Sequence, residues 1–240
     1  MSEQFAYGIG DFEAREAARL VRLAVPANEN QSGFDARTIR RWLGGYSAIR
    51  ANEKVTHPAL WTPQIGRVGD TLHLGFRDLI QLNFVRAFQR EGVGLPTIKR
   101  CLERAQTLAE DERPFATRRF RTDGNTIFAR GAEGIDEADL IDLKTMQQVF
   151  DRIISPSFRD LEFRGDQIAR WFPLGLGKRV VVDPERSFGQ PIDHETGVPT
   201  QVLAEAVDTE GSIERAALVY DVPIKAVREA LAFQRRLDAA

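Results

Sequence analysis

Three arginines occur at helical spacing in one short segment: Arg37, Arg40 and Arg41. Side chains three and four positions apart lie on the same face of a helix. A guanidinium group carries a rigid fork of donors that pairs in a bidentate manner with guanine or with a phosphate. Residues 36–52 contain four arginines and no acidic residue, so the face would be strongly basic. The chemistry that this pattern favours is recognition of a polyanion.

The flanking residues predict a capped helix that positions these arginines. Asp35 is a suitable N-cap, because its carboxylate accepts hydrogen bonds from the free amides of a first turn. Gly44-Gly45 is a stop signal, and between the two ends Ile39, Trp42 and Leu43 form an apolar stripe. A helix with one buried face and one arginine face suits the DNA major groove. A solvated basic surface helix would show the same pattern, so the rest of the chain has to distinguish the two.

Two kinds of DNA contact are expected from this region. The candidates for base contacts are Arg37, Thr38, Arg40 and Arg41. The candidates for phosphate contacts, which set the register, are Tyr46, Arg50, Lys54 and Arg67. Arg67 belongs to a β-rich stretch at 59–76, in which the Gly69-Asp70 turn predicts a two-stranded wing.

Composition is typical of a globular protein with two unlike halves. The 240 residues are 42% apolar and 28% charged, and a single cysteine excludes an internal disulfide or a cysteine-rich zinc site. No apolar run is long enough to span a bilayer and no signal pattern is present, so we expect a cytoplasmic protein. Residues 1–130 carry 20 Lys and Arg against 15 Asp and Glu, whereas residues 131–240 carry 13 against 20. This asymmetry favours a nucleic-acid module fused to a module for another partner.

The order of elements predicts a mainly α protein with small β-hairpins, the α+β class. The first half should contain a helix at 13–24, the arginine helix, the wing and a helical hairpin. The first helix of this hairpin should begin near Asp78 and end at Gly92, and Pro96 should lie near the first position of its second helix. The later expectations are a hairpin at 115–130, a helix at 143–154, strands at 161–163 and 168–172, and a strand at 179–182. Ser212 should cap a helix that a turn at 221–223 joins to a second helix, which gives a helix-turn-helix-like pair. We interpret this pair as a protein-contact or dimer surface.

These elements divide the chain into three parts. Residues 1–130 are expected to form a winged helix-turn-helix DNA-binding domain with a β-hairpin extension. Residues 131–182 would supply a linker helix and short strands, and residues 183–240 a small helical domain. The connection between the first helix and the arginine helix is long for a helix-turn-helix, which counts against the simplest DNA-binding interpretation.

The N-terminal motifs resemble those of the MerR superfamily of winged helix-turn-helix regulators. The matching residues are Glu16-Ala-Ala-Arg-Leu20, Thr38-Ile-Arg-Arg-Trp42 and Asp78-Leu79…Leu82…Val85…Phe88…Gly92-Val93…Leu95…Ile98. The resemblance implies a first helix, a recognition helix, a wing and a supporting helical hairpin. The chain departs from it in the inserted loop at 26–33 and in the absence of a long dimerising coiled coil after Leu108.

The tail from Val180 to Leu231 resembles the bacterial "domain of unknown function 433" group, which is linked to antitoxins. The matching residues are Gly189-Gln-Pro191, Thr196, Val198-Pro199, the 212–220 helix and Val227…Ala230-Leu231. Where that group usually has Gly-Thr-Arg, this chain has Glu195-Thr196-Gly197, so no role of that arginine carries over. Taken together, the parts resemble the long VapB-type antitoxins. That resemblance implies a homodimer that binds operator DNA, represses its own transcription and silences a cognate PIN-domain ribonuclease toxin.

Enzymatic signatures are missing from the sequence. His57, His73 and His194 have no ligand at metal-binding spacing, and neither a Gly-x-Ser-x-Gly elbow nor a phosphate-loop fingerprint occurs. We therefore expect no enzyme, no metal and no cofactor.

Two other function classes remain open. One is a MerR-like regulator that senses a small molecule through its C-terminal half, where Trp171, Phe172 and Phe188 would line an apolar pocket. The other is a protein-interaction module that binds no DNA. An antitoxin should co-purify with its toxin, a sensor should change its DNA affinity on ligand binding, and a pure interaction module should tolerate loss of Arg40 and Arg41.

Overall fold

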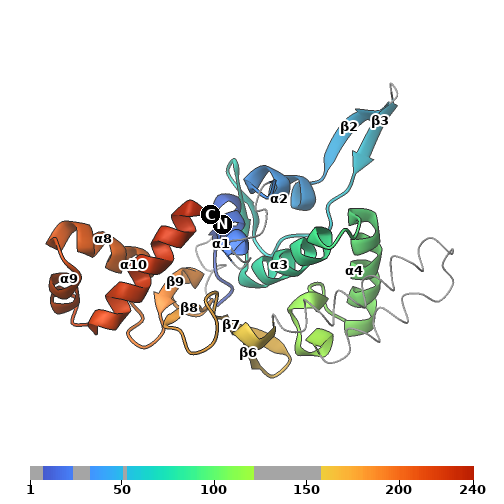
Figure 1. Ribbon diagram of the computed structural model, residues 1–240. Helices are drawn as coiled ribbons and strands as arrows, with labels where there is room; N and C mark the ends of the chain where they lie inside the picture. Colours follow the sequence, from blue (N-terminus) through green and yellow to red (C-terminus); the bar gives the residue numbers. More distant parts are fainter. Residues whose placement is uncertain (1–7, 24–32, 51–52, 122–157) are drawn as a thin grey trace.

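The computed structural model describes residues 8–23, 33–50, 53–121 and 158–240, which form a mixture of helices and small antiparallel sheets (Figure 1). The α+β class expected from the sequence is therefore confirmed. Within these ranges, none of the helices has both the length and the apolar character needed to cross a bilayer.

The N-terminal part consists of helices and two β-hairpins. Its elements are β1 (Phe12–Glu13), α1 (Ala14–Leu23), α2 (Ala36–Gly44), β2 (Tyr46–Arg50), β3 (Glu53–His57), β4 (Gly66–Val68), β5 (Thr71–Leu74), α3 (Phe76–Arg90), α4 (Leu95–Ala109) and the 3-10 turn η2 (Pro114–Ala116). Strands β2 and β3 pair only with each other and project as one hairpin beyond the helices (Figure 1). Strands β1, β5 and β4 form a separate sheet with β5 in the centre.

The C-terminal part places a four-stranded sheet beside three helices. Its elements are η4 (Phe158–Asp160), β6 (Leu161–Arg164), β7 (Gln167–Trp171), β8 (Val180–Val182), η5 (Ser187–Gly189), β9 (Pro191–Asp193), α8 (Thr200–Glu210), α9 (Ile213–Val219) and α10 (Ile224–Ala239). The strands follow the chain order β6-β7-β8-β9. The sequence predicts a boundary between two parts of the chain after residue 182. Strand β8, which ends at this residue, pairs with β9 on the other side of the boundary.

Helix α10 connects the two parts by returning to α1. Phe233 and Leu237 of α10 belong to the same apolar core as the N-terminal helices. Arg19 of α1 donates from Nε to the carbonyl oxygen of Leu237 at 3.0 Å and pairs with Asp238. Helix α10 is therefore packed directly on α1.

Several elements lie where the sequence places them. Helices α1, α3 and α4 are present, and Pro96 occupies the first turn of α4. Strands β6 and β7 pair around the Gly165-Asp166 turn, and β8 ends at Val182. Ser212 caps α9 by accepting a hydrogen bond from the amide of Arg215 at 3.2 Å.

The segment after α4 corrects one expectation. Residues 118–121 are helical, so the first strand of the hairpin expected at 115–130 is wrong. The reason is local, because the hydroxyl of Thr117 accepts from the amide of Phe120 at 3.1 Å and caps the turn. The remainder of the expected hairpin at 115–130 and the expected helix at 143–154 lie outside the described residues. Helix α8 was not anticipated from the sequence.

A buried carboxylate organises the start of α3. Asp78 has no exposed surface, and its oxygens accept from Trp61 Nε1 at 3.0 Å and from Arg113 Nε at 2.6 Å. The backbone amides of Gln64 and Gly75 add hydrogen bonds of 2.7 and 3.0 Å. The carboxylate thus has four donors from three separate segments of the chain.

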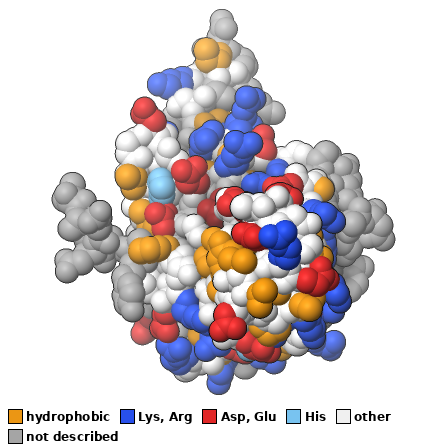
Figure 2. Space-filling view, turned by 90° about the vertical axis from the view of Figure 1, so that its left-hand side faces the viewer, with side chains coloured by type: hydrophobic (Ala, Val, Ile, Leu, Met, Phe, Trp, Pro, Cys, Tyr) orange, Lys and Arg blue, Asp and Glu red, His pale blue; other side chains and the backbone are white. Residues whose placement is uncertain are grey.

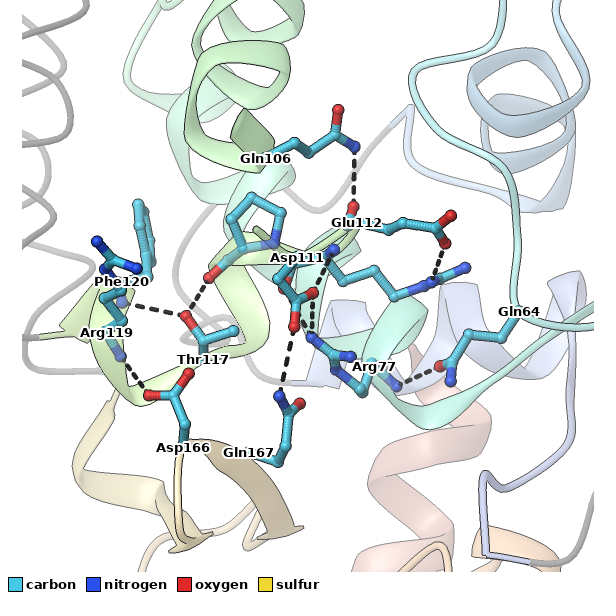
Figure 3. A network of polar contacts seen from close by, with 12 residues as sticks. Gln64, Arg77, Gln106, Asp111, Glu112, Thr117, Arg119, Phe120, Asp166 and Gln167 are labelled. Atoms are coloured by element: carbon cyan, nitrogen blue, oxygen red, sulfur yellow. Dashed lines mark hydrogen bonds and ion pairs between the residues drawn. The ribbon is translucent and has the colours of Figure 1, made fainter. Parts of the chain in front are cut away.

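A second, more open carboxylate continues this network toward the C-terminal sheet. Asp111 accepts from Arg77 at 2.5 Å and from Gln167 of β7 at 3.3 Å (Figure 3). Burial alone would raise the pKa of Asp111, but hydrogen bonds from the Arg113 amide and from Arg77 hold it below its usual value. Arg77 therefore links α3 to the segment that follows α4.

We expect Asp78→Ala to lower the free energy of unfolding by about 3–5 kcal/mol, because it leaves the Arg113 guanidinium buried without its carboxylate. The double variant Asp78→Leu/Arg113→Met should be less destabilised than Asp78→Ala, because it leaves no unpaired charge. Asp208→Ala, at an exposed position of α8, is the control and should change stability by about 0.5 kcal/mol or less. Urea unfolding measures all three, and a cost below about 1 kcal/mol for Asp78→Ala would contradict the role assigned to this pair.

Candidate nucleic-acid interface

Helix α2 begins and ends at the residues that the sequence indicates. Asp35 accepts from the amide of Thr38 at 2.8 Å, and this hydrogen bond is the main reason why the pKa of Asp35 lies below its usual value. Gly45 follows the helix with a φ of 65°, a conformation that residues with a Cβ atom rarely adopt. A Cβ atom at Gly45 would lie 2.8 Å from the carbonyl oxygen of His57, so the turn into β2 requires glycine.

The two faces of α2 are separated as expected. Ile39 and Trp42 are buried on one side. Arg37, Arg40 and Arg41 are exposed on the other. Within the described part of the chain, the guanidinium groups of Arg37 and Arg40 form no ion pair, which leaves them available to an anionic partner.

An aromatic stack joins α2 to the projecting hairpin. The guanidinium carbon of Arg41 lies 4.2 Å from the centre of the Tyr46 ring. The Tyr46 ring in turn stacks on His57, with ring centroids 4.5 Å apart and planes 17° apart. Since Tyr46 opens β2 and His57 closes β3, this stack fixes the base of the hairpin relative to the C-terminal end of α2.

The remaining candidate residues differ in their placement. Thr38 is committed to the helix start, because its hydroxyl contacts the Asp35 carboxylate at 3.1 Å and donates to the carbonyl of Gly33 at 3.0 Å. Lys54 is exposed on β3, and Arg50 ends β2 with its side chain outside the described part. Arg67 is exposed, but it lies on β4 in a different sheet from the other candidates.

The hairpin itself was missed by the sequence analysis, which located the wing at 59–76. The hairpin that directly follows α2 is β2–β3, in which Arg50 lies opposite Glu53. The missed signal is the concentration of strand-forming residues on both sides of Asn52, including Ile49, whose side chain is 80% exposed. The β4–β5 hairpin around Gly69-Asp70 is also present, as expected.

The apolar residues proposed to sense a small molecule do not form one pocket. Trp171 belongs to the main core, whereas Phe172 packs with Val181 and Ile192 in a separate cluster. Phe188 is 60% exposed. The structure therefore does not bring these three side chains together.

Comparison with known proteins finds similarity both in sequence and in structure. The chain is 26% identical over 207 residues to a Mycobacterium tuberculosis protein named "Putative antitoxin VapB45", and the match covers 81% of this chain and 85% of that protein. Its fold is similar to the crystal structure of Rv2018 from Mycobacterium tuberculosis, with a TM-score of 0.66 and 20% identity, over 93% of this chain and 99% of that one. No family model matches the chain.

The cap of α2 provides a test of this arrangement. We expect Asp35→Ala to destabilise the protein by about 1 kcal/mol, because the amide of Thr38 loses its acceptor. Asp35→Ser should retain most of the stability, since serine is also a good N-cap. Hydrogen exchange of the α2 amides measures the effect, and equal protection in the wild type and in Asp35→Ala would contradict the assignment.

Proposed function

We propose that this protein is an antitoxin that binds operator DNA, represses its own transcription and neutralises a toxin partner in the cytoplasm. The observation that carries the DNA-binding part is the exposed arginine face of α2, which continues through Arg41 and Tyr46 into the projecting hairpin. The similarity to the VapB45 relative over most of both chains supports the antitoxin part. On this proposal the N-terminal part is a winged helix-turn-helix of the MerR type, with β2–β3 as its wing.

Helix α2 is the proposed recognition helix. An α-helix with its side chains is roughly 10–12 Å in diameter, which fits a major groove about 12 Å wide. We assign base contacts to Arg37 and Arg40, because their guanidinium groups are exposed and form no ion pair in the described structure. Arg41 is held over the Tyr46 ring, and we assign it to the phosphate backbone together with Lys54. Lys and Arg side chains gather below the tip of the hairpin, at the top of Figure 2.

A homodimer completes the proposed repressor. One α2 helix reads too few base pairs for operator specificity, whereas a twofold dimer would place two such helices in major grooves one helical turn or a multiple apart. The operator would accordingly be palindromic.

The proposed toxin surface lies on the opposite end of the molecule, on α9 and the turn into α10. Leu218, Val219, Tyr220 and Ile224 are 82%, 59%, 40% and 44% exposed. Figure 2 looks onto this end and shows apolar side chains grouped among charged ones. Grouped, exposed apolar side chains rimmed by charge are typical of protein interaction sites. By resemblance to VapB-type antitoxins, we propose that the partner is a PIN-domain ribonuclease.

The DNA-binding proposal is tested by fluorescence anisotropy of the protein on its own upstream DNA and on scrambled DNA, over a salt series. Each lost bidentate arginine contact is worth about 1–3 kcal/mol, so Arg37→Ala/Arg40→Ala should weaken specific binding by at least about tenfold. Lys54→Ala should weaken binding to both DNAs alike and make the salt dependence shallower, as expected for a phosphate contact.

The matched control for this experiment is Arg235→Ala/Arg236→Ala, which removes the same charge from exposed positions on α10. It should leave specific affinity unchanged. Equal, weak binding of the wild type to both DNAs would refute the repressor proposal, and a protein-interaction function would then be favoured.

The partner surface predicts a separable defect. We expect Leu218→Asp to abolish co-purification with the product of the adjacent gene and to leave operator affinity unchanged, because α9, which carries this residue, lies far from α2 in the fold (Figure 1). Leu176→Asp, at another exposed apolar position, should affect neither property. Retention of the partner by Leu218→Asp would show that the toxin binds elsewhere.

A further inference from the structure

Arg22 of α1 is half-buried and Arg86 of α3 is buried, and both lie beside the start of α2 without an ion pair to any acidic side chain of the described residues. Arg86 of α3 is only 3% exposed, and its guanidinium carbon lies 4.8 Å from the centre of the Phe34 ring. Arg22, in the last turn of α1, donates from Nη1 to the carbonyl oxygen of Phe34 at 2.7 Å. Both cations therefore contact the residue that immediately precedes Asp35, the N-cap of α2.

Two donor atoms of this pair are left over. Arg22 Nε and Arg86 Nη1 are buried, and neither has a hydrogen-bond acceptor among the described residues. Burial, and then the charge of Arg22, lower the pKa of Arg86 to about 10. Burial keeps the pKa of Arg22 below its usual value, although the negative charge of Asp35 raises this pKa from a distance. The Asp35 carboxylate itself accepts from the amide of Thr38 at the start of α2 and forms no ion pair in the described structure. The contact with Phe34 compensates Arg86 only in part, because a cation–π interaction supplies no hydrogen-bond acceptor.

We propose that Arg22 and Arg86 form the binding site for a small oxyanion, a phosphate or a carboxylate. Guanidinium groups match such anions in shape and charge, and two of them with free N–H groups are a common way to hold one. The anion would bridge α1 and α3 below Phe34 and so stabilise the N-terminal end of α2. A free anion fits better than a DNA phosphate, because a duplex backbone contacts surface groups whereas Arg86 is almost completely buried.

This site is independent of the proposed DNA-binding and antitoxin functions. Its test is thermal unfolding of the full-length protein with added sodium phosphate, and separately sodium acetate, against sodium chloride at equal ionic strength. At about ten times its Kd, a specific anion should raise the Tm by about 3–5 °C beyond chloride. The intrinsic fluorescence should change in parallel, because Phe34 contacts Trp42 with ring centroids 5.3 Å apart.

The matched pair of variants is Arg86→Met and Arg90→Met, a buried and an exposed arginine of the same helix. Arg86→Met should raise the Tm without added anion, since it removes an unpaired buried charge, and should abolish the response to phosphate and acetate. Arg90→Met should respond as the wild type does. If Arg86→Met does not fold, Arg22→Met provides a second variant, which should also abolish the response to phosphate and acetate; its Tm without added anion is not diagnostic, because it loses the hydrogen bond to Phe34 as well.

Three results would overturn the proposal. The first is an equal effect of phosphate, acetate and chloride on the wild type. The second is a loss of operator affinity in Arg86→Met in phosphate-free buffer with a shallower salt dependence, which would assign the site to a DNA phosphate. The third is a response of Arg86→Met to phosphate and acetate that equals the response of the wild type.

Discussion

The buried carboxylate of Asp78 is the constraint on which the placement of α2 depends. It holds the Trp61 side chain and the Arg113 guanidinium at the start of α3. The residue before Trp61, Leu60, donates its amide to the carbonyl oxygen of Trp42 in the last turn of α2 at 2.7 Å. A continuous path of hydrogen bonds and chain therefore runs from the carboxylate to the end of α2, where the hairpin begins. Because a buried charge without its partner is strongly unfavourable, this path allows few alternative arrangements.

Close backbone packing fixes the C-terminal part on the N-terminal part. Asp11 donates its amide to the carbonyl oxygen of Phe188 at 2.8 Å, and a Cβ atom at Gly189 would lie 2.8 Å from the Phe12 ring. Within the C-terminal part, Arg179 and Asp193 form a bidentate pair. Arg179 Nε and Nη2 donate to the two carboxylate oxygens of Asp193 at 2.5 and 2.8 Å, which holds the end of β9 before the turn that leads to α8. The contacts of Asp11 and Phe12 with residues 188 and 189 join segments far apart in sequence, and the two parts share a core although their compositions differ.

Local sequence signals predicted the elements better than their assembly. The Asp35 cap, the Gly45 stop and the apolar stripe of α2 are short-range features, and each is where the sequence indicates. The β2–β3 hairpin was missed because its strands pair only with each other and project from the body, so no buried face imposes a clear alternation. Thr38 was assigned to base contacts from its position beside the arginines, but a threonine three residues after an N-cap aspartate also satisfies the helix start. Local patterns do not distinguish a capping role from a contact role.

The two proposed surfaces are connected through α1. Its Arg19 holds the end of α10, and one turn later its Arg22 holds the carbonyl of Phe34 before α2. A shift of α10 would therefore move the element that supports the N-terminal end of the arginine helix. If a partner on α9 and α10 changes the position of α1, it changes operator affinity, and thermodynamic linkage requires that DNA change partner affinity by the same factor. A partner that binds without moving α1 has no such route, so the coupling between the two activities depends on how rigidly Arg19 fixes α10.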